Sequence, residues 1–289
     1  MTFLAQPGPA LLPRVDSVPG HARSLAFTLE SGLSLQEAVI RPLRAAGFAS
    51  ATVELEGGAL APFTYVLPAH SPDTSHAAWY SDTHAPAGGA RLERACATLG
   101  LREGQPSLHC HAVWIEADGT RRAGHVLTER SILAAPMAAR AWGLSDVAFQ
   151  AAPDAETNFT LFHPVPQEPA APLPGAARIA ALRIRPNEDV TEALEAACRR
   201  HGFARAVPRG SIGSLVGARF TDGRVVEDIA TELLVTGGGL APDAAGVPRG
   251  TLAVALADMR GQVHEGWLLR GRNPVCITFE LLLEELPPG

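Results

Sequence analysis

The sequence contains no lysine, because all 24 of its basic residues are arginine. This absence excludes Schiff-base chemistry and Walker-type phosphate loops, which both need a lysine amine. The formal net charge is −6, and arginines number 11 against 16 carboxylates before residue 178 and 13 against 14 from there on. Neither half therefore has the positive charge that dominates binding to nucleic acid, and direct DNA binding is not expected.

Long apolar runs and cysteine pairs are also missing. No run of about eighteen apolar residues exists, so no membrane span is expected. The first twenty residues lack a basic segment before an apolar core, which argues against a secretory signal. The four cysteines (Cys96, Cys110, Cys198 and Cys276) have no CxxC spacing and are expected to be free thiols of a cytoplasmic protein.

Three histidines fall in a segment with the pattern of a β-hairpin. His109 and His111 occupy alternate positions of a predicted strand, Asp118-Gly119 predicts the turn, and His125 lies on the returning strand. Alternation turns two imidazoles to one face, and the hairpin brings the third beside them. Three imidazoles that leave a fourth position open suit zinc or another divalent transition metal. The alternative is three ordinary, half-buried sheet histidines.

The remaining pattern predicts strands and helices in both halves, separated by a linker. Residues 1–22 are rich in proline and small residues and predict a loose arm, and residues 164–177, with five prolines, predict a linker. A capping box at Ser34-Leu-Gln-Glu37 predicts a helix that continues through Ala46. The other elements expected in the first half are strands over 25–29, 51–55, 146–151 and 157–162 and helices over 91–99 and 134–142.

The half of the chain after the linker repeats the half before it. The helix start at Asp189–Glu192 matches Ser34–Glu37 at an offset of 155, and the segment 251–269 matches the histidine hairpin at an offset of 142. The first half thus carries 13 extra residues, which we place within 68–86. At the positions of the three histidines, the second copy has Thr251, Ala253 and Trp267. We therefore predict an internal duplication, with domains over 23–163 and 178–289 and one metal site, in the first.

The second copy resembles the PPC (plant and prokaryote conserved) domain over nearly all of 178–285. The resembling segments are Leu182–Ile184, the helix Val190–His201 with Gly202-Phe203, Gly210–Leu215, Ala218–Gly223, Glu232–Gly238 and Leu252–Leu269. The first copy is more divergent, but Leu108-His-Cys-His111, Asp118-Gly119 and Gly124-His125 resemble the histidine version of the same hairpin. That version also occurs, with a shorter turn, in the related α-acetolactate decarboxylases.

The resemblance implies an α+β fold made of two tandem copies of an antiparallel sheet flanked by helices. It further implies zinc on the three histidines and a homo-oligomer, which is a trimer in single-domain members, with a dimer as the other assembly to consider. The decarboxylase has two such domains in each chain and uses carboxylates near its zinc.

These features favour a zinc-dependent lyase, decarboxylase or hydrolase that acts on a small carbonyl or carboxylate compound. Such a site needs a proton donor or acceptor near the metal. Glu156 is the leading candidate, Glu54 and Glu56 are second choices, and a surface location is the alternative for each. Tyr80, with Ser81, Asp82 and His84, is expected to form a lid or wall over the site, or else a solvent-exposed loop.

The alternatives to an enzyme are a non-catalytic DNA-binding or regulatory oligomer and a metabolite sensor. An AT-hook core, the short basic motif that binds the minor groove, is superficially similar to the segment Arg270-Gly-Arg272-Asn-Pro274. However, Asn273 interrupts that core and apolar strands flank it, so we predict a turn between strands, since minor-groove arms are normally flexible and basic. Sequence does not separate a sensor from an enzyme, because the two differ only in turnover.

Overall fold

A computed structural model describes residues 3–168 and 174–287. It is mostly antiparallel β-sheet with two helices, which confirms the predicted α+β class. In residues 3–168 the elements are β1 (Val15–Leu29), α1 (Leu35–Ala45), β2 (Ala51–Glu56), β3 (Ala59–Leu60), β4 (Tyr65–Val66), β5 (Pro68–Ala69), β6 (Trp79–Tyr80), β7 (Ala90–Arg102), β8 (Gln105–Glu116), β9 (Arg121–Val126), β10 (Met137–Leu144), β11 (Val147–Pro153) and β12 (Thr160–Pro166). In residues 174–287 they are β13 (Ala177–Ile184), α2 (Val190–His201), β14 (Ala206–Leu215), β15 (Ala218–Arg219), β16 (Val225–Val226), β17 (Thr231–Pro242), β18 (Pro248–Ala257), β19 (Val263–Trp267) and β20 (Val275–Glu285).

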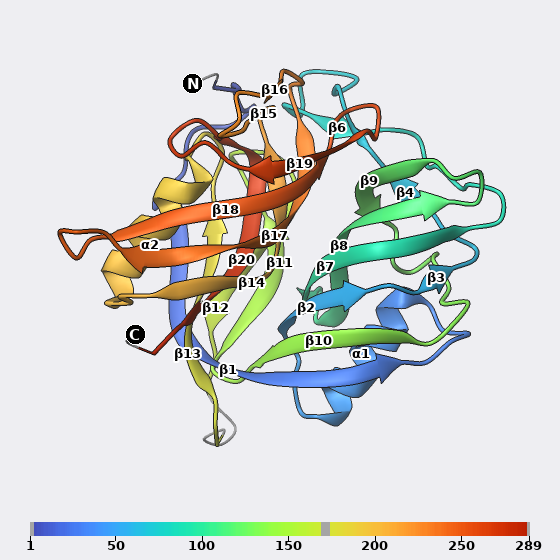
Figure 1. The fold of residues 1–289 in the computed structure, drawn as a ribbon, viewed down its shortest axis with the longest axis horizontal. Helices are drawn as coiled ribbons and strands as arrows, with labels where there is room; N and C mark the ends of the chain where they lie inside the picture. Colours follow the sequence, from blue (N-terminus) through green and yellow to red (C-terminus); the bar gives the residue numbers. More distant parts are fainter. Residues whose placement is uncertain (1–2, 169–173, 288–289) are drawn as a thin grey trace.

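Strand β1 joins the two halves, and it crosses from one to the other along the bottom of Figure 1. Its first part, Val15–Ala22, pairs with β13, and its second part, Ala22–Leu29, pairs with β10. Residues 15–22 are therefore strand, where the sequence predicted a loose arm. The junction lets one hydrogen-bonded sheet run through both halves of the chain.

The strands on the two sides of this junction follow equivalent orders, with each strand of the first half matched by one of the second. Outward from β1 the order is β10-β2-β7-β8-β9, and outward from β13 it is β20-β14-β17-β18-β19. Each half has one helix, and both helices begin with the predicted cap. The Glu37 amide donates to Ser34 Oγ at 3.1 Å, and the Glu192 amide donates to Asp189 Oδ1 at 3.0 Å.

Each half has its own apolar core, and the sheets of the two halves also face each other. Strands β7, β8 and β9 contact β14, β17 and β18. A small buried cluster lies between them, with Cys96, Val113 and Ala123 on one side and Ile212, Leu234 and Ala255 on the other. The face of the first sheet that carries the histidines is therefore covered by the second half.

Two predicted helices are strands. Residues 91–99 lie in β7, whose segment 95–100 is buried on both faces, so its run of small apolar residues lacks the alternation of a half-buried strand. Residues 134–142 fall largely in β10, where Met137, Ala139 and Ala141 are buried and Ala138 and Arg140 are exposed. Alanine favours helix, but pairing with β1 and β2 outweighs that preference here.

The predicted linker is only partly within the described residues. Its first residues belong to β12 and its last residue begins β13, whereas residues 169–173 lie outside the described ranges. Within the described residues, neither helix has the length and apolar character needed to cross a membrane.

Candidate metal centre

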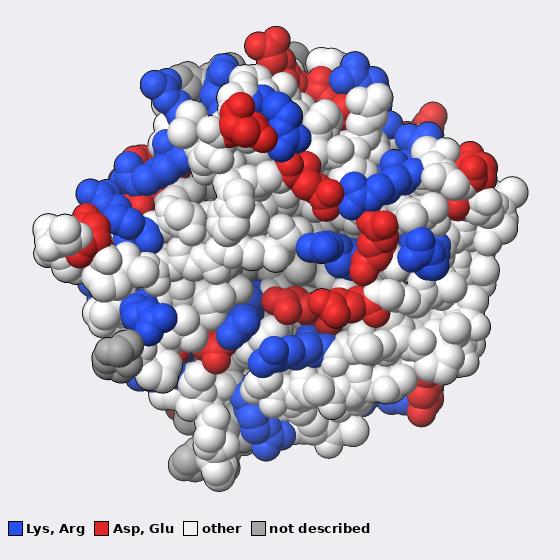
Figure 2. All heavy atoms as spheres, in the orientation of Figure 1, with Lys and Arg blue, Asp and Glu red and all other residues white. Residues whose placement is uncertain are grey.

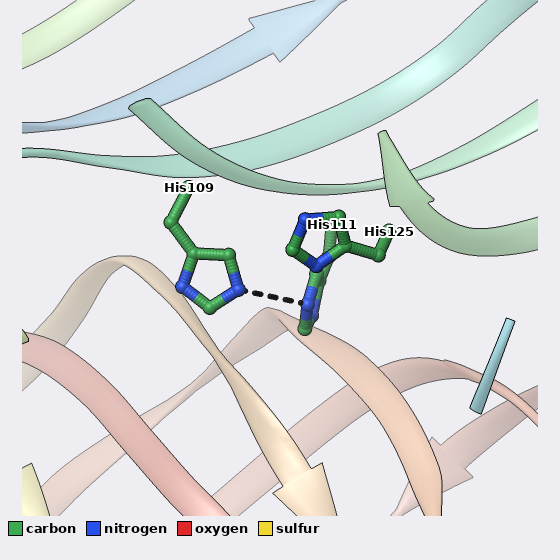
Figure 3. A group of neighbouring side chains, drawn as sticks. All are labelled: His109, His111 and His125. Carbon is green, nitrogen blue, oxygen red and sulfur yellow. Dashed lines mark hydrogen bonds between the residues drawn. The ribbon is translucent and has the colours of Figure 1, made fainter. Parts of the chain in front are cut away.

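The structure brings His109, His111 and His125 together at the interface between the halves. His109 and His111 alternate on β8, and His111 pairs with His125 of β9 across the predicted hairpin. In Figure 3 the three rings approach one another between the strands of the first half and those of the second. One nitrogen from each ring lies within 4.8 Å of the others.

The second half fixes the orientation of two of these rings. His109 Nδ1 donates to Glu280 Oε2 at 3.1 Å, and His111 Nδ1 donates to the Leu233 carbonyl oxygen at 2.9 Å. The two Nε2 atoms lie 3.2 Å apart, and each presents a lone pair when both rings are neutral. Two nitrogens bound to one tetrahedral zinc at 2.0–2.1 Å would lie roughly 3.3 Å apart. The two rings are therefore oriented and spaced as two ligands of such an ion.

Two buried polar atoms at the cluster have no hydrogen-bond partner within the described residues: His125 Nδ1 and Glu232 Oε2. Glu232 Oε1 lies 3.9 Å from both His125 Nδ1 and His111 Nε2. A buried polar atom without a partner costs about 1–3 kcal/mol. A cation among these atoms would remove that cost, so the residues present fit a metal ion.

Burial sets the protonation of the cluster. Burial and the neighbouring charge of His109 lower the pKa of His111 to about 3, and the same two causes, with His111, hold the pKa of His125 well below its ordinary value. Both rings are thus neutral near pH 7, which is the form that binds metals. Burial raises the pKa of Glu232 to about 8, and a cation beside it would favour its charged form.

Tyr80 is the predicted catalytic residue that lies at the cluster. Its ring stands edge-on to His125, with 5.3 Å between the ring centroids. Desolvation, followed by the charges of Glu232 and Glu280, raises the pKa of its phenol, so the phenol is a neutral hydrogen-bond donor. Ser81 and His84 hold the loop instead, since Ser81 Oγ accepts from the Leu67 amide and His84 stacks on Tyr65.

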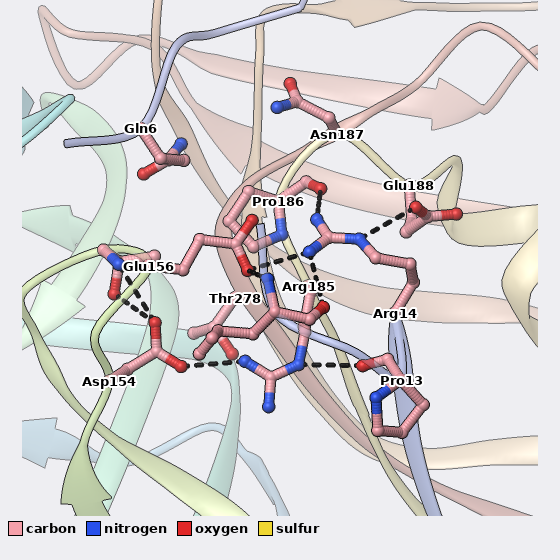
Figure 4. Close-up of polar contacts among 12 residues, drawn as sticks. Gln6, Pro13, Arg14, Asp154, Glu156, Arg185, Pro186, Asn187, Glu188 and Thr278 are labelled. Carbon is pink, nitrogen blue, oxygen red and sulfur yellow. Dashed lines mark hydrogen bonds and ion pairs between the residues drawn. The ribbon is translucent and has the colours of Figure 1, made fainter. Parts of the chain in front are cut away.

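Glu156 and Glu54 are held elsewhere. Glu156, between β11 and β12, accepts from Arg14 Nη1 at 2.8 Å (Figure 4). It also accepts from the Leu11 amide. Glu54 lies two strands away from His111, with Cys96 of β7 between them, and it accepts from the Gly210 amide at 3.0 Å. Neither residue lines the cavities that the histidines line, and Glu56 is exposed at the end of β2.

A cavity of about 730 Å³ opens beside His109 and His125. The segment that precedes β7 contributes His76, Trp79 and Tyr80 to its wall. A smaller space of about 60 Å³ lies against His109, His111 and Glu232. His109 and His125 are thus accessible from a chamber large enough for a small molecule.

Sequence reasoning missed Glu232 and Glu280, the carboxylates that contact the histidines. Both lie in the second half, on β17 and β20, more than 100 residues from the hairpin. A signal was present, because each is a charged residue next to a run of apolar residues in its strand, and such residues are rarely buried without a partner. Which partner they meet depends on how the two halves pack.

The corresponding hairpin of the second half lacks the cluster. Ala253 pairs with Trp267 across β18 and β19, as His111 pairs with His125 across β8 and β9. Thr251 is exposed, and Trp267 is 48% exposed. Within the described residues, the group at His109, His111 and His125 is the one three-residue cluster with metal-ligand geometry.

A model of the Plants and Prokaryotes Conserved (PCC) domain family matches residues 173–287. The matched region covers less than half of the chain. Solved structures similar to the chain include a PPC protein of Pyrococcus horikoshii, with 15% identity and a TM-score of 0.42, covering 50% of this chain and 94% of that one. A metal-containing protein of Archaeoglobus fulgidus has 18% identity and a TM-score of 0.39, covering 48% and 92%. Similarity at this level carries no information about function.

A curated protein is also similar to part of the chain. The bifunctional protein GlmU of Synechococcus sp. is 33% identical in an alignment of 129 residues, which covers 42% of this chain and 19% of GlmU. The chain therefore spans about a fifth of that relative's length. Such partial coverage does not transfer the activity of the whole protein.

Proposed function

We propose that His109, His111 and His125 bind one zinc ion, or another divalent transition metal. The spacing of the ligand nitrogens, the neutral state of two rings and the unpartnered His125 Nδ1 support this proposal. Metal analysis of purified protein should give about one ion per chain. His109→Ala/His111→Ala should lose it with circular dichroism unchanged, whereas the matched change of an exposed histidine outside the cluster, His70→Ala, should retain it.

The observation that carries the functional proposal is the meeting of this cluster with two buried carboxyl groups beside an open cavity. Zinc in such a site would polarise a substrate oxygen or lower the pKa of a bound water. Glu232, Glu280 and Tyr80 would supply proton transfer and hydrogen bonds at that position. We infer a metal-dependent lyase, decarboxylase or hydrolase acting on a small carbonyl or carboxylate compound.

The two halves have different roles in this proposal. We propose that 23–163 and 178–289 are two copies of a PPC domain, supported by their equal strand order and equivalent helix caps. The first copy would supply the metal ligands and the second the carboxylates and the Leu233 carbonyl. Neither half alone would then contain the complete site.

A DNA-binding role receives little support from the surface. Arg270 is held by Glu192 and Glu195, and Asn273 is fully buried in the turn before β20. Arginine and acidic side chains alternate on the face shown in Figure 2, with no continuous basic area.

A metabolite sensor is the second candidate function, because the same cavity would bind an effector.

A homo-oligomer in the cytoplasm completes the proposal, with a trimer as the first expectation. Four buried, free cysteines support a reducing compartment. Light scattering after size exclusion measures the assembly directly, and a monomer at micromolar concentration would contradict it.

Turnover separates an enzyme from a sensor. Zinc-loaded protein should be screened against small 2-oxo and 2-hydroxy acids by following substrate loss and product formation by NMR, with His109→Ala/His111→Ala as the control. Zinc-dependent turnover of one compound supports the enzyme. Saturable binding without turnover supports the sensor, and neither result at millimolar ligand contradicts both.

A further inference from the structure

The wall of the large cavity is aromatic. The Trp79 and Phe159 rings lie 5.2 Å apart, inclined by 27°, and His76 lies 4.2 Å from Trp79. Tyr80 continues this row to the metal-ligand candidate His125. All four of these wall residues line the cavity, and Trp79 remains 37% exposed. An aromatic surface of this kind offers stacking to a flat ligand.

Two arginines without a carboxylate partner line the same cavity. Arg102 Nη2 makes one long hydrogen bond, to the Thr160 carbonyl oxygen at 3.4 Å. Neither Arg102 nor Arg130 forms an ion pair with any carboxylate in residues 3–168 or 174–287. Guanidinium groups that are free in this way bind carboxylates, often through two parallel hydrogen bonds.

Both acidic side chains that line the cavity already accept a hydrogen bond from the protein. Glu280 accepts from His109, and Glu129 accepts from Gln36 Nε2 at 3.2 Å. A divalent ion on the histidines would add two positive charges to the lining. The chamber would then attract an anion, with positive charge at the histidines and at Arg102 and Arg130.

The aromatic wall is confined to the half that carries the histidines. Trp79 and Tyr80 form β6, within the stretch 68–86 where the first half has extra residues relative to the second. The Asn158 side-chain amide donates to the Ser75 carbonyl oxygen at 2.8 Å, which fixes this loop against the turn that carries Phe159. The wall is therefore attached to the same half as the candidate ligands.

We propose that the cavity binds an aromatic carboxylate. Its ring would lie against Trp79 and Phe159, its carboxylate would meet Arg102 or Arg130, and an oxygen near the carboxylate would face the histidines. This inference names the substrate class of the proposed function and rests on it. The chamber of about 730 Å³ lies in the range of small-molecule sites, and an acid of two or three carbons would fill little of it.

Calorimetric titration of zinc-loaded protein with phenylpyruvate and with pyruvate tests the proposal. Phenylpyruvate should bind at least about tenfold more tightly, because it adds ring burial and stacking. Trp79→Ala should remove most of that difference and leave pyruvate unchanged. Arg102→Gln/Arg130→Gln should weaken both acids about tenfold. Trp267→Ala and Arg91→Gln, exposed residues outside the cavity, should change neither affinity.

Equal affinity for the two acids, no binding of either, or an unchanged preference in Trp79→Ala overturns the proposal. Metal content is measured on every sample, so that the two proposals can fail separately. Bound zinc without a preference for phenylpyruvate overturns the aromatic site and leaves the metal centre intact. A preference for phenylpyruvate in protein that binds no zinc supports the aromatic site and contradicts the metal-dependent function.

Discussion

The hairpins β8–β9 and β18–β19 have the same pairing and different surroundings. His111 faces His125 in one, and Ala253 faces Trp267 in the other. The first hairpin is covered by β17, whose Leu233 carbonyl and Glu232 carboxyl reach its histidines, while Trp267 of the second is about half exposed. The first hairpin thus combines three histidines with a covering strand that orients its rings, and the second has Thr251, Ala253 and an exposed Trp267 at the equivalent positions.

The strongest test makes the first hairpin like the second. His109→Thr/His111→Ala introduces the residues of the second half and should reduce bound zinc from about one ion per chain to nearly none, because one imidazole cannot hold the ion tightly. Metal analysis after gel filtration measures the change. Retention of a full equivalent would show that the metal lies elsewhere.

Carboxylates at and away from the cluster should differ in their effect on turnover. Glu232→Gln should reduce kcat of any zinc-dependent reaction about a hundredfold, since general acid–base groups contribute about 10²–10⁴-fold. Glu156→Gln serves as the matched comparison, because its partner is Arg14, and we expect kcat within about twofold. A large loss in Glu156→Gln with normal folding would restore that residue to the mechanism.

A substitution at the contact between the two halves should lower the free energy of unfolding more than a substitution in either hairpin. Asp154 contacts Arg183 and Arg185, each at 2.8 Å, and all three are largely buried. Asp154→Asn leaves two buried guanidinium groups with weaker partners and should lower the free energy of unfolding by about 3 kcal/mol. Urea denaturation measures this loss, and a change below about 1 kcal/mol would contradict it.

Acid should weaken the same junction. Burial alone would raise the pKa of Asp154, but hydrogen bonds and charge from Arg183, with further bonds from Thr157, hold it well below its ordinary value. A carboxyl group whose pKa is lowered in the folded state stabilises the fold fully at pH values above its unfolded pKa, about 3.9. That contribution is lost as the pH falls from there toward the folded pKa. Wild type should therefore lose more stability between pH 4 and 2 than Asp154→Asn, as urea midpoints would show. Parallel losses would refute this assignment.

The smallest effect is expected when three histidines are introduced into the second hairpin. Thr251→His/Ala253→His/Trp267→His gives the second hairpin three imidazoles without orienting partners. Loss of such partners typically costs 10–100-fold in metal affinity. Competition with a chelator should therefore rank the grafted site at least tenfold below the natural one, and equal affinity would show that the covering strand is unimportant.

Local pattern was sufficient for part of this molecule. Alternation at His109 and His111, the Asp118-Gly119 turn and the caps at Ser34 and Asp189 all act within a few residues, and each is present in the structure. The same rules failed at 91–99 and 134–142. Alanine-rich segments there are strands because their neighbours in the sheet decide their conformation.

Short stretches of sequence are enough to predict which imidazoles share a face and where the helices start, and the composition excludes lysine from the chemistry. The contacts of Glu232 and Glu280 with those imidazoles, and the pairing of Glu156 with Arg14, depend on the tertiary structure. The two kinds of feature differ in the distance along the chain between the residues that determine them. Backbone geometry fixes the direction of a side chain from its own segment, whereas the group it meets depends on the packing of strands more than a hundred residues apart.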